Sequence, residues 1–123
     1  MMMMVAAKKL IPGIIGEFEL GNDVEKRSQE ILSAASLNAA IVTKRIRDLS
    51  LALACVYIAM RSGTGRQVRQ EDFAWHFKTS TTTIRKTYRL LCAELSFDRD
   101  MIKSKYLESR RKKDGKSDQS ATG

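Results

Sequence analysis

The sequence predicts an all-α fold: five helices in a single domain. Apolar residues recur with the 3.6-residue helical period in five successive segments, and the 123 residues include only one proline. No run alternates apolar and polar residues with the Val, Ile and Thr content of a β-sheet. A chain of this length can bury one hydrophobic core, so we expect one domain without disulfide or metal cross-links.

The first two predicted helices, 12–20 and 23–36, each have one apolar face. Pro12 suits the first position of the first helix, where no backbone N–H is needed. Asn22, followed three residues later by Glu25, predicts a capping box at the start of the second. The residues expected to face the core are Ile11, Ile14, Ile15 and Phe18, and then Val24, Ile31, Leu32 and Ala35.

The third predicted helix, 43–61, is apolar around most of its circumference. A helix of this kind is normally the buried centre of a bundle. Its small residues would let neighbouring helices approach closely, and these are Ala52, Ala54 and Ala59. The sequence SGTG at 62–65 predicts a turn after it.

The last two predicted helices, 70–77 and 80–97, are joined by a short connection, as in a helix-turn-helix. One face of the second helix carries Ile84, Tyr88, Leu91 and Leu95. The opposite face of its first two turns has no acidic residue and carries Thr82, Arg85, Lys86 and Arg89. Hydroxyl side chains that can cap its N-terminus are Ser80, Thr81 and Thr82. This half of the helix therefore suits contact with a polyanion.

The positive charge is clustered. The chain has a net charge of +8, and residues 61–90 carry seven basic and two acidic side chains. This distribution is typical of nucleic-acid binders. We expect residues 1–9 to be disordered or frayed, 10–98 to form the domain, and 99–123 to be a basic, largely disordered tail. The tail either attracts phosphates or only aids solubility.

Several functional classes are not favoured. Cys55 and Cys92 lie in apolar helical runs without CxxC spacing, so we expect buried thiols and neither zinc nor another cofactor. The sequence offers no paired carboxylates in an apolar setting, no nucleophile with a base and no phosphate loop, so we expect no enzyme. The longest apolar run, 49–60, is too short to cross a bilayer. We expect a soluble protein in the cytoplasm, associated with the nucleoid, or in the nucleus of a eukaryote.

Two segments are also similar to a known family: LALACVYIAMR at 51–61 and QEDFA…TTTIRKTYRLL at 70–91. They resemble the central helix and the last two helices of the cyclin-box repeats in archaeal transcription factor B and eukaryotic transcription factor IIB. The upstream sequence IPGIIGEFELGNDVEKRSQEIL resembles the entry into such a repeat. The resemblance covers about residues 10–98 and implies a five-helix cyclin-like bundle. The Thr83-Ile84-Arg85 sequence is similar to the second repeat, whose helix-turn-helix binds a promoter element beside the TATA box.

The resemblance implies specific roles in DNA binding. Thr82 and Arg85 fall where the family contacts bases, and Lys86 and Arg89 lie near its backbone contacts. Further candidate DNA-binding residues in or near the flanking turns are Arg66, Arg69, Lys78 and Thr81. The chain departs from the family because it contains neither the zinc ribbon nor a second repeat. It also has Lys78 where the family has a turn glycine, and Trp75 and His76 where the family has smaller or apolar residues. We therefore expect no complete initiation factor.

Three functional hypotheses remain. The first is a DNA-binding regulator that resembles transcription factor B, of archaeal or archaeal-viral type, and binds duplex DNA with helix 80–97. Its candidate protein partners are the TATA-binding protein and other transcription machinery. The alternative is a cyclin-box protein–protein interaction module, either a homodimer or partner-binding, without specific DNA recognition. The third is non-specific nucleic-acid association through charge. Trp75 either seals the core or anchors a partner, and His76, with no evident ligand or acid partner, is expected to be structural.

Overall fold

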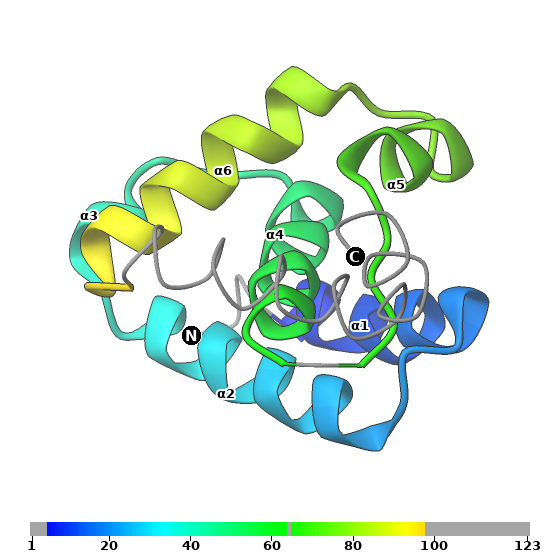
Figure 1. The fold of residues 1–123 in the computed structure, drawn as a ribbon. Coiled ribbons are helices and arrows are strands. Elements are labelled where there is room, and N and C mark those ends of the chain that lie inside the picture. The colour runs from blue at the N-terminus through cyan, green and yellow to red at the C-terminus, as the bar shows by residue number, and fades with distance from the viewer. Residues whose placement is uncertain (1–4, 64, 98–123) are drawn as a thin grey trace, which may run out of the picture.

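Helix α4 lies at the centre of a helical bundle (Figure 1). The computed structural model describes residues 5–63 and 65–97, and over these ranges it contains six helices and no strand. The helices are α1 (Val5–Phe18), α2 (Asn22–Ser36), α3 (Ala39–Val42), α4 (Asp48–Arg61), α5 (Gln70–His76) and α6 (Thr81–Glu94). The all-α prediction is confirmed. Residues 1–4 and the predicted tail at 99–123 lie outside the described residues.

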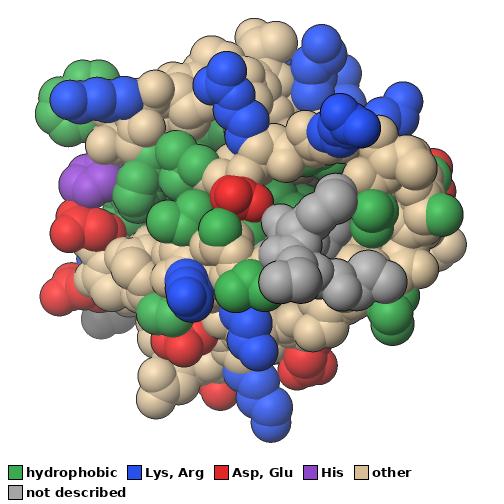
Figure 2. All heavy atoms as spheres, turned by 180° about the vertical axis from the view of Figure 1, so that it is seen from behind, with side chains coloured by type: hydrophobic (Ala, Val, Ile, Leu, Met, Phe, Trp, Pro, Cys, Tyr) green, Lys and Arg blue, Asp and Glu red, His purple; other side chains and the backbone are tan. Residues whose placement is uncertain are grey.

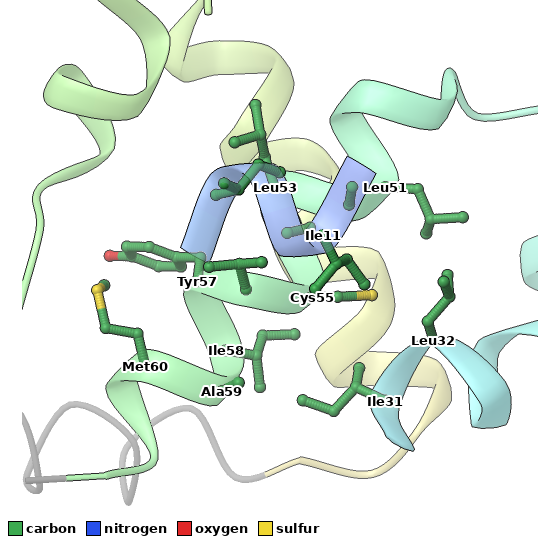
Figure 3. Packing of buried hydrophobic residues seen from close by; sticks show 14 of the residues in the cluster. Ile11, Ile31, Leu32, Leu51, Leu53, Cys55, Tyr57, Ile58, Ala59 and Met60 are labelled. Carbon is green, nitrogen blue, oxygen red and sulfur yellow. The ribbon is translucent and has the colours of Figure 1, made fainter. Parts of the chain in front are cut away.

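The prediction that α4 forms the buried centre is also confirmed. Every residue from Ser50 to Met60 is buried, so no side of this segment faces solvent. Helices α1, α2 and α6 pack against it. Figure 3 shows Ile11 of α1 and Ile31 of α2 converging on Cys55 and Ile58. Because the alanines of α4 are fully buried and small, three helices can reach its backbone closely.

Helix α1 begins at Val5, a full turn and more before the predicted start, and Pro12 lies inside it. The apolar stripe continues upstream through Ala7, which is completely buried, and this burial offsets the disruption that proline causes. A proline at position 12 cannot donate to the carbonyl of Lys8, one turn earlier. The side chain of Gln29, from α2, donates to that oxygen at 3.4 Å instead. The helix is thus completed by a tertiary contact.

The capping box predicted for α2 is wrong. The N-cap is Gly21, whose φ of 91° is a conformation that glycine adopts without strain, and no side chain caps this end. Its carbonyl accepts the first helical hydrogen bond from Glu25 N–H at 3.2 Å. The predicted core face of α2 is confirmed, since Val24, Ile31, Leu32 and Ala35 are all buried.

The predicted helix 43–61 begins too early, and the short helix that precedes it was not predicted. The short helix α3 is capped by Asn38, whose side-chain oxygen accepts from Ile41 N–H at 3.1 Å. The chain then turns through Arg45, which has a φ of 51°, and α4 starts at Asp48 and not at Thr43. A left-handed residue cannot continue a right-handed helix, so Arg45 separates α3 from α4.

Candidate nucleic-acid interface

A tight turn connects α5 to α6. Only the residues Phe77–Ser80 separate the two helices. Lys78 has a φ of 55°, and Thr79 N–H donates to the carbonyl of Ala74 at 2.9 Å, which closes the C-terminus of α5. Phe73, fully buried, fixes α5 on the core. The turn therefore sets the direction in which α6 leaves α5.

The N-terminus of α6 is held by Ser80. Its hydroxyl accepts from Thr83 N–H at 3.1 Å, so Ser80, and not Thr81 or Thr82, is the cap. Thr87 is buried and donates to the carbonyl of Thr83 at 3.0 Å. These hydroxyl groups serve the helix itself. The Thr82 hydroxyl makes no hydrogen bond within the described part of the chain and is exposed.

The inner face of α6 is anchored on α4. Ile84 and Leu91 are fully buried, as predicted. Tyr88 meets Tyr57 edge to face at a centroid distance of 5.1 Å, and burial raises the pKa of Tyr88 to about 12. Helix α6 ends at Glu94, three residues before the predicted end, because Ser96 adopts a φ of 60°. With one side fixed in this way, the opposite side of α6 must face solvent.

That outer side carries the predicted contact residues. At about 100° per residue, the four side chains lie within an arc of about 100°, centred opposite Ile84. All four are exposed; we refer to them together as the α6 arc, and they are Thr82, Arg85, Lys86 and Arg89. Its three cations form no ion pair with any described residue. In Figure 2, Lys and Arg side chains line the upper edge, where α6 lies, and most acidic side chains lie below it.

The other four predicted residues are arranged less favourably. Lys78 is exposed in the turn that leads into α6, close in sequence to the arc. Thr81 is half-buried and lies on the flank of the helix. Arg66 pairs with Glu19 at 3.3 Å and Arg69 pairs with Asp72 at 3.5 Å, so each has a carboxylate partner already. Of the eight residues predicted to bind DNA, the structure thus brings the four of the α6 arc together on one surface, and Lys78 lies in the turn that precedes them.

The structure corrects the expectation for His76 and decides between the two alternatives for Trp75. His76 has an acid partner: its Nε2 lies 2.9 Å from a carboxylate oxygen of Glu17, in α1. No local pattern could reveal this pair, because the partners are far apart in sequence. Trp75 is 84% exposed, which excludes the core-sealing alternative. Both line a hollow of about 340 Å³ together with Phe18, Arg66, Gln67, Val68 and Asp72.

The described residues contain no group of three or more His, Cys, Asp or Glu side chains arranged to hold a metal. Over the same ranges, no helix has the length and hydropathy needed to span a membrane. Cys55 and Cys92 are buried and are not joined in a disulfide, as predicted. Comparison with protein-family models, with curated proteins and with solved structures found no match.

Proposed function

We propose that this chain binds duplex DNA through the α6 arc, with α5 and α6 acting as a helix-turn-helix. The observation that carries the proposal is the arc itself: three unpaired cations and a free hydroxyl on the outer side of a helix whose inner side is fixed in the core. An α-helix fits the major groove of B-form DNA, and an arc of this width is the part that would face the bases. The turn and core keep that surface in one orientation.

Each arc residue has a role that suits its chemistry. Arg85, on the second turn of α6, can donate two parallel hydrogen bonds to the O6 and N7 of guanine. Thr82 offers a hydroxyl and a methyl group to a base edge. Lys86, Arg89 and Lys78 would contact phosphates, which require charge more than fixed geometry. Arg66 and Arg69 would join only by exchanging their carboxylate partners for phosphate.

The wider role that we propose is regulation of transcription by a protein that resembles transcription factor B. The similarity of segments 51–61 and 70–91 to a cyclin-box repeat supports this role, as does the order of helices around α4. On this proposal the protein acts at the nucleoid, or in the nucleus of a eukaryote, and the TATA-binding protein or another component of the transcription machinery is a candidate partner. The alternative of an interaction module that does not recognise DNA is favoured by one observation, the exposed Trp75.

Selection of bound duplexes from a random pool tests the proposal. We expect an enriched sequence motif, and gel-shift titrations of that motif against a scrambled duplex measure the preference. Arg85→Ala should lower the preference by about 1–3 kcal/mol while non-specific binding remains. Lys26→Ala is the matched control, because it removes one exposed cation from α2, on the other side of the bundle from α6 (Figure 1).

Salt titration tests the number of phosphate contacts. Lys78 and the three cations of the arc are unpaired, and Arg66 and Arg69 could add to them, which gives four to six contacts. The slope of log K against log salt should therefore be about −4 to −5, and Lys86→Ala should reduce it by about 1. A selection without a motif, or an unchanged preference in Arg85→Ala, would refute sequence recognition by the arc.

A further inference from the structure

A second surface, formed by the end of α1, the segment before α5 and α5 itself, differs in character from the α6 arc. It centres on Trp75 and the neighbouring hollow, and we call it the Trp75 face. Its residues are Glu17, Phe18, Glu19, Arg66, Gln67, Val68, Arg69, Asp72, Trp75 and His76. Figure 2 shows the single histidine, in purple, beside a group of hydrophobic side chains.

The charges of the Trp75 face are paired with one another. Arg66 contacts Glu19 at 3.3 Å, Arg69 contacts Asp72 at 3.5 Å, and His76 contacts Glu17 at 2.9 Å. With histidine counted as neutral, as in the net charge of +8, the three acidic side chains and two arginines give this face a net charge of −1. This arrangement contrasts with the α6 arc, whose cations are unpaired and therefore suited to phosphate.

At the centre of the face, an exposed tryptophan projects beside a hollow, like a knob beside a hole. Trp75 is 84% exposed, and it borders a hollow of about 340 Å³ that is lined by the apolar Phe18 and Val68 and by polar side chains. An exposed tryptophan next to a pocket of apolar and polar side chains is the usual anatomy of a protein–protein contact. Knob and hole also lie on the same face, which is the requirement for a two-fold contact in which each copy fills the other.

Charge decides in favour of a second copy of this chain. With a net charge of +8, two copies repel one another over most approaches. A two-fold contact sets each surface against itself, so it is tolerated where the net charge of that surface is small. The Trp75 face, with a net charge of −1, satisfies this condition, and the α6 arc, with three cations, does not. We infer that the chain forms a homodimer through the Trp75 face, with Trp75 of each copy seated in the hollow of the other.

The contact uses α1, the segment before α5, and α5, and none of the α6 arc residues. Arg66 and Arg69 are the two residues that it shares with the possible phosphate contacts. The inference does not require DNA binding, and it is tested on the full chain without DNA. Trp75 is the only tryptophan in the sequence, so intrinsic fluorescence reports on this side chain alone. Sedimentation measures whether the chain dimerises, and fluorescence measures whether Trp75 is buried in the dimer.

We expect a change from one copy to two, each of 13.9 kDa, as concentration rises from about 1 µM to about 1 mM. Over the same range the emission of Trp75 should shift to the blue and its quenching by acrylamide should fall. Trp75→Ala should weaken dimerisation by about 30-fold or more, as for a tryptophan at the centre of an interface. Leu37→Ala is the matched control, since Leu37 is 79% exposed and lies at the end of α2; it should leave dimerisation unchanged.

A charge variant tests the same face without touching the tryptophan. Asp72→Arg removes the partner of Arg69 and makes the face positive in both copies, so dimerisation should weaken by about 10-fold or more and recover partly in high salt. Glu30→Arg, on the exposed side of α2, makes the same charge change elsewhere. A chain that stays monomeric throughout, or a dimer in which Trp75 remains fully quenchable, overturns the inference; the former would leave the face to a different protein.

Discussion

Replacing Lys78 with glycine should stabilise the protein. Lys78 joins α5 to α6 and has a φ of 55°, a left-handed conformation that side chains with a Cβ atom adopt at a cost. Its side chain is exposed, and its N–H donates to the carbonyl of Trp75 at 3.4 Å, a bond that glycine preserves. The substitution therefore removes strain and loses no packing.

The expected gain follows from two opposing terms. Relief of the left-handed conformation is worth about 1–2 kcal/mol, and the greater freedom of glycine in the unfolded chain offsets about 0.5–1 kcal/mol of it. The free energy of unfolding should rise by about 0.5–1 kcal/mol. For a domain of this size, the melting temperature should increase by about 2–8 °C.

Thermal and urea denaturation, followed by the helical circular dichroism signal, measure the effect. Lys78→Ala keeps the Cβ atom and removes the same charge, so it should change stability by less than about 0.5 kcal/mol. Lys86→Gly makes the same replacement within α6, where it should destabilise by about 1 kcal/mol. If Lys78→Gly destabilised the protein as much as Lys86→Gly does, the left-handed turn between α5 and α6 would be refuted.

Two further predictions concern α6 and the core. Ser80→Ala removes the acceptor for Thr83 N–H and should lower the free energy of unfolding by about 1 kcal/mol, measured by urea denaturation. Ser80→Asn keeps an acceptor and should lower that free energy much less. Equal decreases in the two variants would exclude the cap. Burial raises the pKa of the Cys55 thiol from 9.0 to about 12, so the unfolded chain loses this proton first as pH rises. Stability should then fall by about 1.4 kcal/mol per pH unit between pH 9 and 12, and be fully present below pH 9. Urea titrations across this range should show a shallower dependence in Cys55→Ala, and an identical dependence in both proteins would contradict the buried thiol.

The helices and their core faces were largely predictable from the sequence. The stripes that contain Ile14, Ile31, Leu53 and Ile84 repeat with the helical period, and each is buried. Periodicity is a local property, and burial follows from it once enough apolar faces can meet. The same reasoning located the α6 arc, because the side of a helix opposite its buried stripe must face solvent.

Element boundaries were less predictable, for a different reason. The sequence pattern predicted that α1 begins at Pro12, but the helix extends upstream because Ala7 is buried in the core. The side chain of Gln29 donates to the carbonyl of Lys8, which proline cannot do. Likewise, a left-handed residue at Arg45 moves the start of α4 from the predicted Thr43 to Asp48. Tertiary contacts and single backbone angles outweigh local preference by only a few kcal/mol, and no local pattern records them.

The sequence by itself thus determined the helical class, the central position of α4 and the composition of the α6 arc. Only the tertiary structure decided which cations stay free and which are paired. Arg66 and Glu19 are 47 residues apart, and His76 meets Glu17 across two helices, so these ion pairs exist only because α1 and α5 pack on the same core. The structure also left Trp75 exposed beside a hollow of apolar and polar side chains, because the inner side of α5 is filled by Phe73 and Ala74. Contacts between distant segments depend on the whole packing arrangement, and they separate the two surfaces of this protein.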